Sequence, residues 1–276
     1  MVEVAYQEPA FEESEMYEEY IPEPEPEPEV INIPMNISEA EHTIQDGGIL
    51  VGMPALTLKL LGCNLNCIWC DVKKKKVDRA YNMSSIIPLL VGYADLDLVI
   101  TGGEPLIQPN ALGYILNIAL DARQELGYSS NVVVETNGTI SPDILKRSQH
   151  ETCRLTNEKM NSIVWSVNPK LHSSGEEWSK TKFVDFIDFR NIQIKLTVNP
   201  FDADDVTDMR RIVSLIPNGI HIVAQPVVRD LEDYDHEGYQ KSLSELFKII
   251  TDERFARVRL IPQIHKVIWG MQKESL

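Results

Sequence analysis

Three cysteines occupy the stretch GCNLNCIWCD, residues 62–71, in the spacing C-x3-C-x2-C. Thiolates at Cys63, Cys67 and Cys70 could bind a metal, form a disulfide or carry out redox chemistry. A structural zinc site needs four ligands, usually in two pairs, and no second C-x2-C or H-x3-H pair follows. A disulfide between residues so close would close a very small loop and stabilise little. Iron–sulfur ligation accounts better for three thiols, and a four-iron cluster would keep one iron open for a substrate or cofactor.

The cysteine usage and overall composition indicate one large α/β domain in a reducing compartment. A chain of 276 residues can bury a substantial core. Only four cysteines occur, and the fourth, Cys153, stands alone in HETCRLT as a structural or incidental thiol. This usage suits a metal or redox site better than a secreted disulfide scaffold. The acidic N-terminus differs from a signal peptide, and no apolar run approaches the roughly 20 residues of a membrane span. We therefore expect a cytoplasmic protein that does not associate with membranes.

The formal net charge of −16 is concentrated at the start of the chain. Residues 1–30 contain eleven glutamates and no lysine, arginine or aspartate, and they end in IPEPEPEPEV. Because proline and like-charge repulsion both oppose regular structure, we expect residues 1–31 to form a disordered, solubilising tail. Residues 32–276 would then be the catalytic domain. Without the eleven charges of the tail the chain carries only −5, which argues against a broad nucleic-acid-binding face.

Short β-rich runs alternate with amphipathic segments through the rest of the chain. Apolar residues recur at spacings of three and four in residues 110–126, 204–216 and 239–251, which predicts helices. This alternation is typical of βα units around a parallel sheet. The predicted strands are residues 55–60, 96–100, 131–135, 162–166, 192–198, 221–226 and 258–261. Seven strands are too few for a complete eight-stranded barrel, so we predict a partial (β/α) barrel.

Polar or glycine-rich segments follow directly after five of the predicted strands. These segments are LGCNLNCIWCD, TGGEP, TNGT, VNPK and PVV. In parallel α/β folds, ligands bind at the carboxyl ends of the strands. We therefore expect the functional site at this edge of the sheet.

The cysteine spacing followed by TGGEP resembles the radical S-adenosylmethionine (SAM) superfamily. The resemblance implies that the three cysteines hold a 4Fe-4S cluster whose open iron binds SAM. Electron transfer would cleave SAM to methionine and a 5'-deoxyadenosyl radical, which abstracts a hydrogen from the substrate. The glycines would let the backbone approach the methionine moiety, and the glutamate would accept a hydrogen bond from its ammonium group. The implied SAM-binding residues are Gly102, Gly103, Glu104, Glu135, Thr136, Asn137, Ser166, Asn168 and Lys170.

Nearly the whole chain after the tail is similar to the 7-carboxy-7-deazaguanine synthase family. The similarity rests on ISEAEHTIQDGG, LKLLGCNLNCIWCDV, TGGEPLIQ, ETNGT, NPKLHSSGE and RLIPQIHKVIWG. It implies a lyase that converts 6-carboxy-5,6,7,8-tetrahydropterin to 7-carboxy-7-deazaguanine, for queuosine or DNA modification. Hydrogen abstraction at carbon 6 would start a ring contraction in which ammonia leaves and SAM is regenerated. The resemblance also implies magnesium and a homodimer.

The same resemblance implies a substrate site. Gln45 would hydrogen-bond the amide edge of the pterin, and Lys59 would stand where the family has an arginine that pairs the substrate carboxylate. Thr101, Gln225 and His265 would complete the site. Without the resemblance, Lys59 reads as an ordinary strand lysine, and His265 reads as a satisfied histidine near the last strand.

The sequence departs from the family pattern mainly around the substrate and magnesium. The glutamate that the family has in this segment is absent, and Asp46 lies one position before its place. Lys59 lacks the planar guanidinium group with which an arginine would bind a carboxylate through two hydrogen bonds. Val72 replaces a threonine or serine and has no oxygen for Mg²⁺, so the magnesium requirement stays open. Asn168 replaces a serine, although Ser166 lies close by. The cofactor half of the pattern is nearly intact.

Two other functions stay open on the sequence alone. A radical SAM activase would act on a protein partner, would need a docking surface, and would lack the PQIHK ending. A zinc or interaction module would be colourless, whereas an iron–sulfur protein is brown and absorbs near roughly 400 nm. The run KKKK, residues 73–76, reads as a solvated surface or as a docking site for an acidic electron donor such as flavodoxin.

Overall fold

The computed structural model describes residues 33–70, 81–227 and 236–269 of the chain. The chain divides into two units, Met1–Asn32 and Ile33–Leu276, and the elements below belong to the second. The expectations for the acidic tail, for Val72 and for the lysines at 73–76 fall outside the described residues. In the described part of the chain, no helix has the length and apolar character needed to cross a membrane.

One sheet of eight strands, in the order β1 to β8, forms the centre of the domain. β1 runs antiparallel to β2, and each later strand is parallel to the one before it. The strands are β1 (Ile37–Ile44), β2 (Pro54–Leu60), β3 (Asp97–Gly102), β4 (Val132–Thr136), β5 (Val164–Val167), β6 (Ile192–Val198), β7 (His221–Pro226) and β8 (Val258–Leu260). No ladder joins β1 to β8 within the described residues, so the predicted partial barrel is confirmed.

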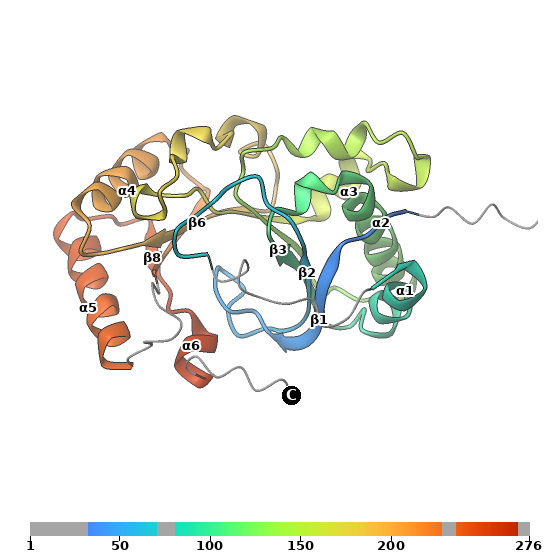
Figure 1. Cartoon of the computed structure of the whole chain (residues 1–276), viewed down its shortest axis with the longest axis horizontal. Coiled ribbons are helices and arrows are strands. Elements are labelled where there is room, and N and C mark those ends of the chain that lie inside the picture. Colours follow the sequence, from blue (N-terminus) through green and yellow to red (C-terminus); the bar gives the residue numbers. More distant parts are fainter. Residues whose placement is uncertain (1–32, 71–80, 228–235, 270–276) are drawn as a thin grey trace, which may run out of the picture. The chain divides into compact units, whose positions relative to one another are not determined.

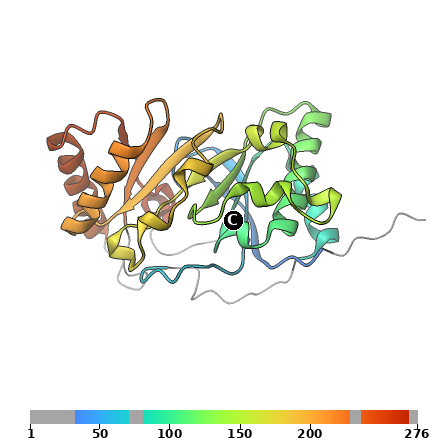
Figure 2. The same ribbon diagram turned by 90° about the horizontal axis from the view of Figure 1, so that it is seen from above.

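Six α-helices accompany this curved sheet in the described residues, and all but the last lie on its outer side, as Figures 1 and 2 show. They are α1 (Met83–Gly92), α2 (Pro109–Leu126), α3 (Asn157–Ser162), α4 (Ala203–Leu215), α5 (His236–Asp252) and α6 (Ile264–Trp269). Helix α2 begins with a proline, and Gly127 caps it in the left-handed conformation at φ 73°. Asp202 caps α4 by accepting hydrogen bonds from two backbone N–H groups.

Seven of the eight strands and the three longest helices were predicted from the sequence, each within a few residues of its observed bounds. Strand β1 was missed, together with α1, α3 and α6. β1 has the sequence ISEAEHTI, and only its first residue is buried. A half-exposed edge strand with so many polar residues lacks the apolar run that reveals the buried strands.

The two faces of the sheet differ in character. The outer face carries the main core, in which Leu58, Ile100 and Ile194 pack with helix residues such as Leu116. The inner face carries a small apolar patch near the amino ends of the strands, formed by Ala55, Val99, Val133, Val164 and Leu50. Beyond that patch, the buried inner residues are largely polar. They include Thr57, Asp97, Ser166, Gln193, Lys195, Thr197 and Gln225.

The segment between β1 and β2 closes the amino end of the barrel. Gln45 pairs with Met53 and Gly52 through two backbone hydrogen bonds of 2.8 and 2.9 Å. Ile49 donates its backbone N–H to Gln193 Oε1 across the interior at 2.8 Å. Because Leu50 packs on the apolar patch, this end is filled by the chain itself. The carboxyl end carries the polar side chains.

Candidate functional site

The three clustered cysteines lie on the loop that follows β2. All three are free thiols; Cys63 is exposed, Cys67 is buried and Cys70 is half-buried. The other cysteine, Cys153, is buried, and its backbone packs against Gly113 of α2. Three thiols on one loop at the carboxyl end of a parallel strand fit the donor set of a cluster with one open iron.

Two neighbouring loops hold the cysteine loop on either side. Asn64 Nδ2 donates to Thr139 Oγ1 at 2.7 Å. On the opposite side, Asn66 N donates to Glu176 Oε1 at 2.7 Å, and Ile68 N donates to Ser174 O at 2.8 Å. Contacts with segments over 70 residues away fix the loop, so the thiols do not depend on local sequence alone.

The TGGEP segment supports the cysteine loop directly through its backbone. Gly103 N donates to Leu60 O, and Glu104 N donates to Gly62 O, both at 2.8 Å. A Cβ atom at Gly103 would lie 1.8 Å from Gly62 O, and one at Gly102 would lie 2.3 Å from Leu60 O. The two glycines are therefore required where two backbones meet. Their expected contact with SAM stays a prediction.

Glu104 is fully buried and accepts three hydrogen bonds within the protein. Its Oε1 accepts from Leu106 N at 3.0 Å and from Thr136 Oγ1 at 2.8 Å, and its Oε2 accepts from Asn137 N at 2.7 Å. Burial raises the pKa of this carboxyl, although the three donors oppose that shift. Glu104 thus joins the ends of β3 and β4. A further hydrogen bond from the SAM ammonium group remains a prediction.

Residues of the ETNGT segment divide between two roles. Glu135 faces the interior, where its Oε2 accepts from Thr101 Oγ1 at 2.9 Å and its Oε1 pairs with the Lys195 ammonium. Asn137 faces the cysteine loop; its Nδ2 donates to Asn64 Oδ1 at 3.0 Å and lies 3.9 Å from Cys63 Sγ. An amide donor near a ligand sulfur stabilises negative charge on it.

The segment after β5 brings a second set of polar groups to the same edge. Ser166 Oγ accepts from Gln193 Nε2 at 3.0 Å, and Asn168 N donates to Thr136 O at 2.7 Å. Lys170 Nζ lies 5.5 Å from the ring centroid of Trp69, which precedes Cys70. Burial lowers the pKa of Lys170, and the charge of Cys67 opposes that shift.

Two buried polar atoms at this edge of the sheet lack a hydrogen-bond partner among the described residues: Trp69 Nε1 on the cysteine loop and Asn168 Oδ1 after β5. Buried polar atoms are almost always satisfied, so each orphaned atom calls for a bound group. A donor and an acceptor beside the cysteine loop suit an amino acid moiety such as that of SAM. The residues therefore fit both the cluster and SAM.

Four of the five predicted substrate residues lie on or beside the polar interior. Thr101 and Gln225 point inward from β3 and β7, at 2.9 and 3.3 Å from Glu135 and Thr197. Lys59 is paired with Glu39 of β1, and His265 Nδ1 lies 3.2 Å from Asp46 Oδ2. Burial opposes ionisation of Asp46, but contact with His265 and the charges of Lys195 and Lys59 hold its pKa well below the usual range.

The structure separates Gln45 from this group. Its Nε2 donates to Asp97 Oδ2 at 2.7 Å, at the amino end of β3, and the residue is buried. Asp97 also accepts from Asn131 N at 2.6 Å. Gln45 therefore links the segment after β1 to the amino end of β3, and its expected contact with the pterin stays a prediction.

One inner-face residue, Lys195, was missed in the sequence. It lies in the middle of β6 and is 4% exposed. The strand IQIKLTV alternates apolar residues with Gln193, Lys195 and Thr197, all of which are buried. Side chains alternate between the two faces of a strand, and the polar residues of this strand occupy every second position. This alternation could have assigned Lys195 to the inner face of the barrel.

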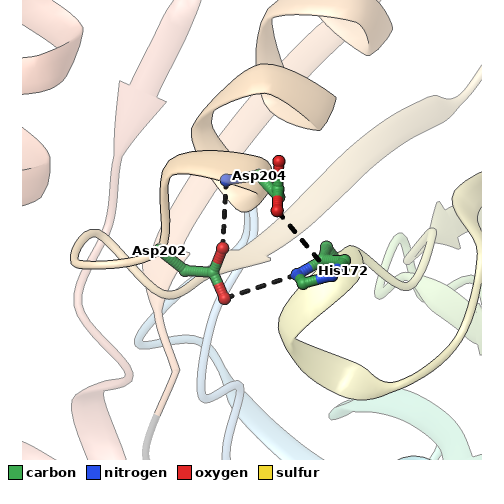
Figure 3. A group of neighbouring side chains, drawn as sticks. All are labelled: His172, Asp202 and Asp204. Atoms are coloured by element: carbon green, nitrogen blue, oxygen red, sulfur yellow. Dashed lines mark hydrogen bonds and ion pairs between the residues drawn. The ribbon is translucent and has the colours of Figure 1, made fainter.

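A cluster at the start of α4 holds the loop that supports the cysteines. His172 lies between Asp202 and Asp204, with Nδ1 3.5 Å from Asp202 Oδ2 and Nε2 3.8 Å from Asp204 Oδ2 (Figure 3). Next to it, buried Asp205 accepts from Ser173 N at 2.6 Å and from Ser173 Oγ at 2.7 Å. Three potential ligand atoms meet here, but capping and ion pairing account for all of them. We interpret the group as a structural ion-pair cluster that holds the loop at His172 against the start of α4.

Comparisons with known proteins agree with this geometry. No protein-family model matches the chain. The chain is 35% identical over 262 residues to a 7-carboxy-7-deazaguanine synthase of Halobacterium salinarum, covering 87% of this chain and 92% of that protein. A protein of the same name from Aquifex aeolicus is 29% identical over 83% of this chain and 91% of its own length. The crystal structure of QueE from Escherichia coli shares the fold, with a TM-score of 0.55, 20% identity, and coverage of 83% and 93%.

Proposed function

This chain belongs to the 7-carboxy-7-deazaguanine synthase family, and on that premise we propose that it is a radical SAM lyase of 7-deazaguanine biosynthesis. Its substrate is 6-carboxy-5,6,7,8-tetrahydropterin, and its product is 7-carboxy-7-deazaguanine. The observation that carries the proposal is the identity with the Halobacterium salinarum protein over nearly the full length of both chains. The polar strand ends around the cysteine loop supply the site that this chemistry needs. A protein-activating role is not favoured by these relatives.

The cofactors implied are a 4Fe-4S cluster on Cys63, Cys67 and Cys70, and SAM beside it. Together these would supply the 5'-deoxyadenosyl radical that abstracts hydrogen from carbon 6 of the substrate. The chain itself holds the thiols in place through the TGGEP backbone, whose N–H groups bind Leu60 O and Gly62 O. Lys170 would pair with the SAM carboxylate, because it is a half-buried cation close to the cysteine loop.

The inner face would bind and orient the substrate. Thr101, Glu135 and Gln225 project from three parallel strands and offer both donors and acceptors. A buried polar wall of this kind fixes a heterocycle in one orientation and keeps bulk water from a radical. The apolar patch beneath them closes the opposite end of the barrel.

Several further features belong to the proposal. Electrons would come from a reductase or flavodoxin, and the chain would act as a homodimer in the cytoplasm, where its four thiols stay reduced. Val72, at the position where the family has the threonine or serine that binds magnesium, lies outside the described residues.

The decisive experiment is anaerobic incubation of the reduced, cluster-loaded protein with SAM and 6-carboxy-5,6,7,8-tetrahydropterin. We expect 7-carboxy-7-deazaguanine and ammonia in equal amounts, detected by mass spectrometry and an ammonia assay. SAM should be regenerated, so 5'-deoxyadenosine should not build up in step with the product. Accumulation of 5'-deoxyadenosine without any deazaguanine would refute the substrate assignment.

A further inference from the structure

Two lysines extend from strands that line the barrel, and they differ in how their charge is balanced. Lys59 on β2 lies opposite Glu39 in the β1–β2 ladder. Its Nζ is 2.5 Å from Glu39 Oε2 and 4.0 Å from Glu41 Oε2. Two carboxylates of the neighbouring strand therefore already balance the one ammonium group. A substrate carboxylate at Lys59 would face two negative charges of the protein.

Lys195 on β6 is the more buried of the two. Within the described residues, its ammonium group makes one hydrogen bond, to Glu135 Oε1. An ammonium group has three donors, so two are left for a ligand. Burial lowers the pKa of Lys195, but the charges of Glu135 and Asp46 outweigh burial and raise it, so the group stays protonated. A buried, charged donor with spare capacity is rare unless it binds something.

An unsatisfied acceptor lies beside Lys195. Gln225 is 7% exposed, and its Oε1 has no hydrogen-bond partner among the described residues. Its Nε2 is used, because it donates to Thr197 Oγ1 at 3.3 Å. The amide is therefore anchored at one end and leaves an acceptor for an N–H group of a ligand.

Gly47 is the residue that approaches both of these side chains. A Cβ atom at Gly47 would lie 2.7 Å from Gln225 Oε1 and 4.0 Å from Lys195 Cδ. The glycine brings the loop between β1 and β2 against this pair without adding a side chain. A cation and an orphaned acceptor side by side match a ring that carries a carboxylate and N–H donors.

The position of Lys170 separates this pair from the cofactor. The charges of Cys67 and Cys63 act on Lys170, and so does the charge of Lys195. The main charges that act on Lys195 are those of Glu135 and Asp46. Lys170 Nζ lies 5.5 Å from the ring of Trp69 on the cysteine loop, whereas Lys195 lies in the middle of β6 and pairs with Glu135. A carboxylate at the cluster belongs with Lys170, and a second carboxylate belongs with Lys195.

We propose that Lys195, and not Lys59, binds the carboxylate of the pterin substrate, while Gln225 Oε1 accepts a hydrogen bond from a ring N–H group. This inference rests on the proposed function and names a specificity-determining residue for it. Lys195 then takes over the task that the family pattern gives to the position of Lys59. It would reject a pterin without a carboxylate, because two ammonium donors would stay unpaired in a buried site.

Equilibrium binding to the cluster-loaded, SAM-saturated protein tests this directly. The probes are 6-carboxypterin and pterin, whose fluorescence reports binding and which differ only in the carboxylate. The variants are Lys195→Met, which removes the charge, Lys195→Arg, which keeps it, and Lys59→Met, the competing assignment. The matched control is Lys248→Met, an exposed lysine paired with Glu245 on α5. Iron content and the SAM dissociation constant report whether each variant is folded.

The wild type should prefer 6-carboxypterin over pterin by roughly 10- to 100-fold, the ratio for a hydrogen-bonded charge. Lys195→Met should lose this preference while binding SAM normally, and Lys195→Arg should keep a preference for the carboxylate. If Lys195→Met does not load a cluster, the preference in Lys195→Arg and Lys59→Met decides between the two lysines. The inference is overturned if the wild type shows no preference, if Lys59→Met alone abolishes it, or if Lys195→Met weakens SAM binding instead.

These outcomes are separate from those of the proposed function. A protein that makes no deazaguanine but binds 6-carboxypterin through Lys195 would refute the reaction and keep the carboxylate site. A protein that makes deazaguanine with normal KM in Lys195→Met would keep the reaction and refute the carboxylate site.

Discussion

Cys67 is the most buried of the three thiols on the cysteine loop, with 7% of its surface exposed. Burial raises the pKa of this thiol, while the charge of Lys170 lowers it. Binding to iron removes the proton from such a thiol and compensates for the solvation that the thiolate loses on burial. A buried thiol at this position is therefore compatible with iron ligation. The loop contacts on both sides hold the segment that carries this thiol.

Replacing Cys67 with alanine should abolish cluster binding, because three thiolates are the least that can hold a four-iron cluster with one open site. Iron and sulfide analysis after anaerobic reconstitution measures this, together with the absorbance near roughly 400 nm. Cys153→Ala is the matched control, since Cys153 is buried elsewhere. Full cluster content in Cys67→Ala would show that another residue is the ligand.

At the residue scale, the cofactor side of the site could be predicted because its motifs are contiguous in the sequence. The side-chain partners of Gln45 and Lys59 could not be predicted, because Asp97 and Glu39 lie 52 and 20 residues away in the sequence. A side chain's charge balance depends on such neighbours, which spacing does not reveal. Lys195 was overlooked because a lysine in an apolar strand reads as solvent-facing.

Close backbone contact between loops is the central feature at the element scale. Gly103→Ala places a Cβ atom on Gly62 O, where no flexible side chain can move away. We expect a loss of roughly 1–3 kcal/mol in the free energy of unfolding and a lower cluster content, because the cysteine loop must shift. Thermal or denaturant unfolding and iron analysis measure the two effects.

The control for this change is Gly92→Ala at the end of α1, where a Cβ atom meets nothing within 4 Å. It should alter the free energy of unfolding by no more than about 0.5 kcal/mol. Equal effects of the two substitutions would show that the contact with Gly62 does not position the cysteine loop.

The ion-pair cluster at the start of α4 should make the thermal stability of the protein depend on pH. The hydrogen bond to Asp202 raises the pKa of His172 above its ordinary 6.5. A raised folded-state pKa means that the ion pair contributes fully below 6.5 and is lost as pH rises through the raised value. The melting temperature of the wild type should therefore fall more steeply than that of His172→Gln between about pH 6 and pH 8. Identical slopes would contradict this role.

At the element scale, buried strands could be predicted and the edge strand could not. The run LDLVI reveals β3 because both of its faces are buried, and apolar residues then occupy the consecutive positions 98–100. β1 has only partial burial, and Lys59 of β2 pairs with its Glu39, so its strand-forming contacts are ionic as well as apolar. Such a strand is specified by its partner rather than by its own pattern.

At the scale of the whole molecule, most of the formal net charge lies in the acidic residues at the start of the chain and not in the catalytic unit. Removing residues 1–31 deletes eleven glutamates and brings the formal charge from −16 to −5. We expect the shortened chain to load its cluster and turn over substrate within about twofold of the full chain, because the second unit contains the site. Its solubility should fall as its net charge approaches zero.

Parallel turnover and iron measurements on the two chains test this. A turnover number reduced by about tenfold or more, at equal iron content, would show that the tail takes part in catalysis. Loss of cluster loading would show instead that the catalytic unit needs the tail to fold.

The sheet as a whole could be predicted in type, because alternating strand and helix patterns such as those of β6 and α4 leave few topologies. Strand β1 and the filled amino end could not be predicted. They depend on a segment, residues 45–53, whose packing on Ala55 and whose hydrogen bond with Gln193 connect distant parts of the chain.

In the part of the chain that the structure describes, no ladder joins β1 to β8, and this determines how the barrel can change width. A fully closed barrel has a circumference fixed by its hydrogen-bond register, and widening it means breaking a whole row of backbone bonds. Here Asp46, which follows β1, reaches across to α6, where its O accepts from Ile264 N at 2.9 Å and its carboxylate meets His265. Contacts of this kind can be exchanged one at a time, at about 1 kcal/mol each. The seam between β1 and β8 is therefore held by contacts weaker than a strand ladder, and a change of width at this seam would leave the seven ladders from β1–β2 to β7–β8 intact.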